Sequence, residues 1–291
     1  MKKILTVLFF VLLVSISGQV VVDGSLADAD YISIASKENS NAGFGGSIDV
    51  NEIVYYADVS NSILYLGFKS KLDVTNSNGL GVWLNISGTS SPTGISSGTS
   101  LGFAEAGHYM TGAFKSDFEV DYMFAFNPGS SSTNIYWDAA KLIGCNTAEY
   151  QGSCDQSGTP TLNSNAAGGI FTQDNVAFAF DNSGTSNTGL ELGIPFSEIG
   201  ATSAMQIEVF AFIVSSTGYF SDVTVPGNVT AGNLGNNPDF SILSGGIYNS
   251  GSQALPVELT NFTASSVDGS VVLNWETATE VNNYGFDVEA S

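Results

Sequence analysis

The sequence predicts an all-β protein: a large antiparallel β-sandwich, jelly-roll-like, followed by an incomplete second β module. Beyond residue 18, apolar residues do not recur with the spacing of a helix. Short runs of β-branched and aromatic residues recur instead, and clusters of Gly, Ser, Asn and Pro separate them. Many short strands without intervening helices form antiparallel sheets that pack face to face.

The first 18 residues have the pattern of a secretory signal peptide. Two lysines precede an apolar run over residues 4–14, and small residues at positions 15, 17 and 18 provide a cleavage site. The run is too short to cross a bilayer comfortably, and a buried strand is the alternative interpretation. We expect residues 1–18 to be removed on export, with no membrane span left. The mature protein is then secreted or held on the outer cell surface.

The main domain, residues 20–250, is expected to be built almost entirely from strands. A short helical turn is expected at residues 197–200, because a proline that ends a strand precedes it and Gly200 closes it. A Gly/Ser-rich stretch at residues 88–102 is expected to be a loop. The expected strands are residues 54–59, 62–69, 79–87, 117–126, 134–139, 175–180, 189–196 and 206–214.

The clearest alternation covers residues 117–126. Because side chains alternate between the two faces of a strand, we expect five apolar side chains on one face and three acids on a solvated outer face. Retaining β-sandwich glycosidases of the laminarinase-like family carry two glutamates on such a strand, but Met123 and Phe124 occupy the positions of the second. We therefore expect no catalytic residue here. The apolar residues are Phe118, Val120, Tyr122, Phe124 and Phe126, and the acids are Asp117, Glu119 and Asp121.

Composition and charge exclude some functions. The chain has 28 Asp and Glu against 7 Lys, no Arg, and a formal net charge of -21. Without Arg there is no bidentate partner for phosphate or guanine, and the acidic field repels a nucleic-acid backbone. The single histidine, His108, lies near Glu105, and no nucleophile-elbow motif accompanies it. We therefore predict that the protein does not bind nucleic acid and is not an enzyme.

One pair of cysteines suggests a disulfide, and a set of four polar residues suggests a metal site. Cys145 and Cys154 are the only cysteines, and an oxidising compartment favours one local disulfide between them; two buried thiols are the alternative. Calcium is the one metal considered and no other cofactor is expected. Its candidate ligands also form ordinary turns, which explains them without a metal. These ligands are Asp28, Asp30, Asp181 and Asn187.

Aromatic side chains provide the candidate ligand-binding residues, because exposed rings stack on the apolar faces of sugars. Trp83 shares its strand face with a glycine and an asparagine, so we expect its ring to be exposed. Trp137 is expected in the core, and burial is the alternative for every ring. The candidates are Trp83, Tyr109, Tyr136 and Tyr219.

A boundary falls near residues 250–253, and residues 255–291 form a distinct segment. It contains LPVELTNFTAS and VVLNWETATEVNNYGFDVE, two strands around an Asp268-Gly269 turn with the start of a third. This segment resembles the fibronectin type III-like region of Bacteroidetes-type secreted proteins, where it precedes a sorting domain for type IX secretion. The resemblance implies the type IX secretion machinery as a partner and a core position for Trp275. The sorting domain does not follow, so we expect a fragment or a different end to export.

The main domain has a weaker resemblance. VVVDGSLADADY, NSILYLGFKSKL, GLGVWLNIS and GLELGIPFSEIG occur in the order found in modules of the carbohydrate-binding family 9 and DOMON-like type, and in uncharacterised secreted bacterial proteins. The resemblance implies a secreted or cell-surface, non-catalytic binding module, with polysaccharide or cell-surface glycan as the favoured ligand. A structural or adhesive surface protein without a small-molecule ligand is the alternative, and a β-sandwich glycoside hydrolase is the third hypothesis.

Overall fold

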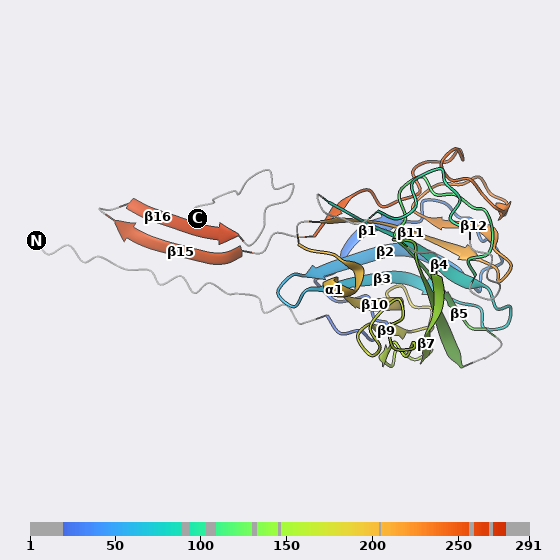
Figure 1. The fold of residues 1–291 in the computed structure, drawn as a ribbon, viewed down its shortest axis with the longest axis horizontal. Helices are drawn as coiled ribbons and strands as arrows, with labels where there is room; N and C mark the ends of the chain where they lie inside the picture. Colours follow the sequence, from blue (N-terminus) through green and yellow to red (C-terminus); the bar gives the residue numbers. More distant parts are fainter. Residues whose placement is uncertain are drawn as a thin grey trace, which may run out of the picture.

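Two antiparallel β-sheets packed face to face form the main body of the protein in the computed structural model (Figure 1). The expected all-β sandwich is confirmed. No helix in the described part is both long and apolar enough to cross a bilayer. The structure describes residues 20–88, 93–102, 109–129, 133–144, 147–203, 205–255, 259–267 and 270–277, so the signal-peptide segment lies outside it.

The first sheet has the strand order β1-β2-β3-β10-β9-β8. The expected strands at residues 54–59 and 62–69 are present as β2 and β3, which pair antiparallel. The predicted helical turn is present as α1 (Phe196–Ile199), and Gly200 ends it in the left-handed conformation, at φ 65°. The strands are β1 (Ile32–Ser36), β2 (Asp49–Asp58), β3 (Ile63–Lys71), β8 (Thr161–Leu162), β9 (Ala177–Phe180) and β10 (Gly189–Pro195).

The second sheet has the order β13-β12-β11-β4-β5-β6-β7, and β14 pairs with β11 beside this path. Strand β7 is one edge of the sheet and the two-residue β13 is the other. The strands are β4 (Gly79–Ser87), β5 (Tyr122–Asn127), β6 (Asn134–Lys141), β7 (Thr147–Asp155), β11 (Gln206–Val214), β12 (Tyr219–Val225), β13 (Gly235–Asn236) and β14 (Gln253–Ala254).

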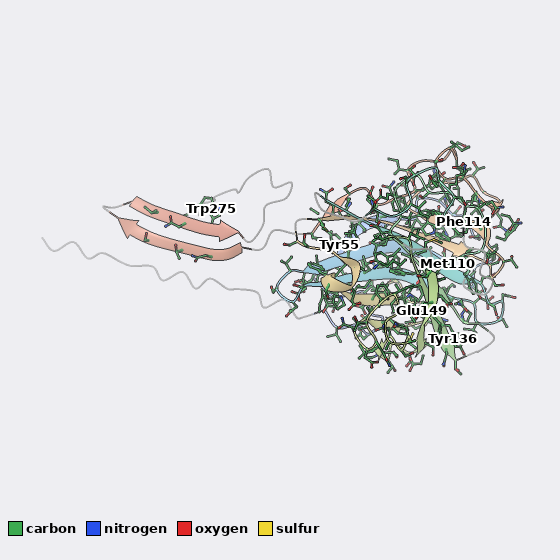
Figure 2. All side chains as sticks on the ribbon, in the orientation of Figure 1. Tyr55, Met110, Phe114, Tyr136, Glu149 and Trp275 are labelled. Atoms are coloured by element: carbon green, nitrogen blue, oxygen red, sulfur yellow. The ribbon has the colours of Figure 1, made fainter. Side chains whose placement is uncertain are left out.

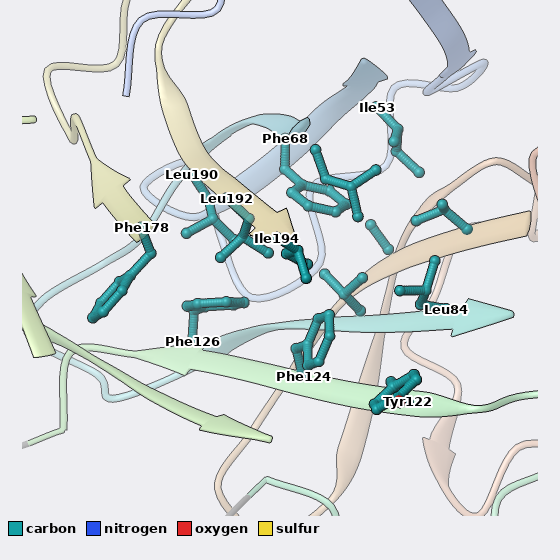
Figure 3. Packing of buried hydrophobic residues seen from close by; sticks show 14 of the residues in the cluster. Ile53, Phe68, Leu84, Tyr122, Phe124, Phe126, Phe178, Leu190, Leu192 and Ile194 are labelled. Carbon is teal, nitrogen blue, oxygen red and sulfur yellow. The ribbon is translucent and has the colours of Figure 1, made fainter. Parts of the chain in front are cut away.

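The inner faces of the two sheets meet in one continuous core (Figure 3). Trp137 lies in it as predicted, and its ring makes an edge contact with Phe178 of the opposite sheet, with centroids 5.1 Å apart. Each large apolar side chain buried in this way contributes roughly 1.5–3 kcal/mol to folding. The core therefore holds the two sheets together, and the short helix that follows β10 adds Phe196 and Ile199 to it.

The outer face of the second sheet is apolar too, and loops cover it. Trp83, Met123 and Phe210 point away from the inner core into a second buried cluster. The covering side chains come from residues 95–120 and 229–248, which lie outside the named strands except for β13. They include Leu101, Met110, Phe114, Phe118, Val120, Val229, Phe240 and Tyr248.

This second layer corrects the prediction for residues 117–126. Strand β5 begins only at Tyr122, and the chain changes face there: Phe118 and Val120 lie in the outer cluster, whereas Tyr122 lies in the inner core. Asp121, expected in solvent, is 0% exposed, and its Oδ2 accepts the Ile86 backbone N–H at 2.8 Å. Apolar residues do alternate over residues 117–126. Of the five expected on one face, those before residue 121 pack in the outer cluster, and those after it pack in the inner core.

The tail forms a two-stranded hairpin that stands apart from the sandwich, from β15 (Leu259–Val267) and β16 (Ser270–Thr277) (Figure 1). Its turn residues Asp268 and Gly269, and the expected third strand, lie outside the described residues. Trp275 is 41% exposed rather than buried in a core. Within the described part, a single two-stranded layer offers no second sheet to cover its ring.

Candidate functional site

The candidate site is the outer face of β6 and β7, at the edge of the second sheet. Tyr136 and Tyr150 lie there with their ring centroids 6.3 Å apart and their planes at 43°. Tyr150 is 44% exposed and Tyr136 is half-buried. Figure 2 marks Tyr136 in this part of the sandwich. We call these rings the tyrosine patch, together with the neighbouring side chains of Asn134, Asp138 and Ser153.

The pairing of β6 with β7 puts these side chains on one face. Directly opposed residues in an antiparallel pair share a face, and Tyr136 is opposite Ser153 while Asp138 is opposite Tyr150. The register shifts between Trp137 and Asp138, which adds one residue to β7. This β-bulge is why Tyr150 and Ser153, three positions apart, both face outward.

Polar groups accompany the rings. The Asn134 side-chain amide donates to the Ser153 hydroxyl at 3.4 Å, and the Asp138 carboxyl is buried below Tyr150. A sugar offers apolar C–H faces to an aromatic ring and hydroxyls to amides and carboxylates. The patch supplies both kinds of group on one open strand face.

Tyr109 supports the patch from below and is not part of its surface. It is buried, and its hydroxyl donates to the carbonyl oxygen of Ser77, whose own hydroxyl donates to the carbonyl oxygen of Gly129. A Cβ on Gly129 would lie 3.1 Å from the ring of Tyr136, so only glycine allows this close approach. Burial, reinforced by the charge of Asp138, raises the pKa of Tyr109 to about 12, which keeps its hydroxyl a donor.

Of the other predicted ligand residues, Trp83 is buried, so the prediction that its ring is exposed is wrong. Its side chain is 1% exposed, because the covering loops bury the outer face of β4. Tyr219 is 38% exposed, but it begins β12 and packs against Phe44 near the opposite edge of the sheet. The structure thus links Tyr109 to Tyr136 only through Ser77 and Gly129, and it leaves Tyr219 apart.

Tyr150 is absent from the sequence-based candidates. Residues 145–154 suggest a disulfide-closed loop in the sequence, whereas most of this segment is the edge strand β7. The sequence carries no clear signal for it, because the bulge places two buried residues, Gln151 and Gly152, side by side and interrupts the alternation of a regular strand. Cys154 faces the inner core and burial raises its pKa to about 12. Cys145 lies outside the described residues, so the disulfide stays a prediction.

The proposed calcium ligands lie in two neighbouring segments. The Leu26 backbone N–H donates to the Asn187 carbonyl oxygen at 2.8 Å, which joins the segment before Asp28 and Asp30 to the loop after Asp181. The Asp181 carboxylate accepts the Ser183 backbone N–H at 2.8 Å, as in an ordinary Asx turn. Among the described residues no group of three or more acids, histidines or cysteines is placed to hold a metal. Calcium binding stays a prediction.

The three acids of residues 117–121 hold loops in place rather than lining a cleft. The Asp117 carboxylate accepts the Tyr248 backbone N–H at 2.8 Å, and the Glu119 carboxylate accepts that of Gly94 at 3.3 Å. Both side chains are half-buried, so the solvated face expected for them is only partly present. His108 and Glu105 lie outside the described residues.

A polar hollow of about 480 Å³ lies on the inner-face side of the same edge, between the end of β6 and residues 168–170. Lys141 and Glu149 line it (Glu149 is marked in Figure 2). The Glu149 carboxylate already accepts the Ile170 backbone N–H at 2.8 Å. No aromatic ring lines this hollow, so it lacks the stacking surface that the tyrosine patch offers.

Comparisons with protein-family models, with curated proteins and with solved structures found no match.

Proposed function

We propose that this protein is a non-catalytic glycan-binding module that acts outside the cell and binds through the tyrosine patch. One observation carries the proposal: two neighbouring tyrosine rings, one of them 44% exposed, share an uncovered strand face with the Asn134 amide and the Ser153 hydroxyl. Elsewhere on this sheet the large aromatic side chains of the outer face are covered by loops. Leaving this pair uncovered exposes apolar area to water, a cost that binding would offset.

The export signal and the composition support the extracellular setting. The first 18 residues have the signal-peptide pattern, and the type IX secretion machinery remains the partner that the tail resemblance implies. A rigid strand face suits a binding module, because the rings are held in place before the ligand arrives and little entropy is lost on binding.

The test is the variant Tyr150→Ala. It removes the most exposed ring of the patch without opening the core, so we expect glycan affinity to fall at least about tenfold while the fold is kept. Affinity electrophoresis in gels containing soluble polysaccharides such as xyloglucan, mannan and laminarin measures the change. Tyr150→Phe keeps the ring and should retain most of the affinity.

Leu162→Ala is the matched control. Leu162 is 47% exposed, close to the exposure of Tyr150, but it lies on β8 of the other sheet. Equal loss in both variants would contradict the assignment of the site. No binding of the unaltered protein to any polysaccharide would reject the proposal and favour the structural or adhesive surface role.

A further inference from the structure

We infer that the tyrosine patch takes an uncharged glycan, not one that carries carboxylate or sulfate groups. The inference rests on the proposed function and narrows its ligand class. It comes from where the cations of this chain lie, because a sugar acid needs a positive partner at its binding surface.

The chain has few cations to offer. Arg is absent, and only five lysines follow the signal-peptide segment. Three of them already pair with acids elsewhere. The pairs are Lys37 with Asp49 at 2.8 Å, Lys69 with Glu52 at 2.7 Å, and Lys115 with Asp239 at 2.8 Å.

The other two lysines also lie away from the patch. Lys71 ends β3 in the first sheet, beside a hollow lined by residues 184–186. Lys141 ends β6, five residues beyond Tyr136. Because side chains alternate between the two faces of a strand and five is odd, the Lys141 side chain lies on the opposite face from Tyr136. At about 3.4 Å per residue Lys141 lies roughly 17 Å from Tyr136 and roughly 10 Å from Asp138, the residue opposite Tyr150. Its charge acts on Glu198, whose pKa it helps to lower.

Apart from Lys141, the two described strands that carry the patch, residues 134–141 and 147–155, contain no lysine. The charged groups at the patch are acids instead. Asp138 lies opposite Tyr150, and Asp155 lies opposite Asn134 on the same face.

These acids decide the ligand class. An anionic sugar at the patch would be repelled by the buried Asp138 and the half-buried Asp155, with no lysine there to offset the repulsion. A neutral glycan meets no such repulsion, and its hydroxyls can bond to the Asn134 amide and the Ser153 hydroxyl. The acids at the patch therefore favour an uncharged glycan.

The experiment compares polymers on one protein. Xyloglucan, mannan and laminarin are uncharged, whereas alginate and polygalacturonate carry carboxylates. We expect at least one neutral polymer to bind about tenfold or more tightly than either acidic one, and its affinity to be the same at low and high salt. Tyr150→Ala should weaken that binding.

Equal or tighter binding of an acidic polymer, lost at high salt, would overturn the inference. If Tyr150→Ala still weakened that binding, the proposed function would stand. No binding to any of the five polymers would reject the proposed function and the inference together.

A gain-of-function variant tests the charge argument directly. Ser153→Lys places a cation on the face of Tyr136, so we expect it to add salt-sensitive affinity for alginate that the unaltered protein lacks. Ser252→Lys makes the same change of net charge at an exposed position next to β14, away from β6 and β7. This variant should not gain affinity for alginate. The same gain in both variants would show that net charge, not the patch, governs the preference.

Discussion

Trp83 is the residue whose surroundings decide its role most clearly. Five phenylalanine rings surround it, and the nearest, that of Phe212, has its centroid 4.9 Å away. The other four centroids lie between 5.2 and 6.2 Å. Its indole N–H is buried and has no hydrogen-bond partner among the described residues. The ring therefore acts through packing, as the centre of the layer between the second sheet and its covering loops.

Trp83→Ala should accordingly destabilise the fold. Removing a fully buried indole leaves a large cavity, and we expect the free energy of unfolding to fall by about 3–5 kcal/mol, measured by urea denaturation. Trp83→Phe keeps most of the packing and removes the unpaired donor, so it should cost much less. If Trp83→Ala kept full stability but lost glycan binding, the ring would belong to the binding surface after all.

At the scale of elements, the eight strands expected in the main domain are present, but β1, β7 and β12 are absent from the expected strands, and most strand partners could not be predicted. The runs at residues 54–59, 62–69 and 206–214 are strands because β-branched and aromatic residues mark them regardless of context. The change of face at Asp121 has no such local mark. It depends on Ile86 and Gly94, which meet this segment only in the folded chain.

The N-terminal segment, residues 20–31, has no regular secondary structure over most of its length. It nevertheless covers part of the outer face of the first sheet. Val20 and Val22 pack with Tyr65 on the outer face of the first sheet. The Glu191 carboxylate accepts the backbone N–H groups of Asp23 and Gly24, both at 2.8 Å. The segment is held by apolar contacts and by one buried carboxyl.

Gly67→Ala should loosen this segment. A Cβ at Gly67 would lie 2.5 Å from Leu26 and 2.7 Å from Val54, so both side chains must move. We expect a loss of about 1–3 kcal/mol and faster hydrogen exchange confined mainly to residues 20–31. Gly46→Ala is the control, because a Cβ there meets nothing within 4 Å. Unchanged exchange in the first variant would show that Leu26 yields without releasing the segment.

For the whole molecule, the sandwich follows from composition and strand pattern, but the covering layer does not. Its apolar residues, such as Leu101, Met110 and Phe114, are separated by Gly, Ser and Thr and follow no period. They are buried only because the outer face of β4, β5 and β11 is itself apolar. The covering layer buries Trp83 and leaves the edge at β6 and β7 uncovered. For this reason Tyr136 lies at the surface, whereas Trp83 does not.

The charge balance of the whole molecule predicts how its stability depends on pH. Burial raises the pKa of Asp121 and of Glu191 to about 7 each. A carboxyl with a raised pKa binds its proton more tightly in the folded than in the unfolded chain. Stability is therefore highest near the unfolded pKa, about 4, and is lost as pH rises through 7. Repulsion within a chain of net charge -21 acts in the same direction.

We expect the urea midpoint to rise as pH falls from 8 to about 5, with each buried carboxyl contributing roughly 3 kcal/mol at most. Glu191→Gln and Asp121→Asn remove the titrating groups, so each should flatten the profile. Asp73→Asn should not, because hydrogen bonds from Thr75 hold the pKa of Asp73 at about 2, below this window. A midpoint that fell on acidification to pH 5 would show that carboxylates with lowered pKa values dominate.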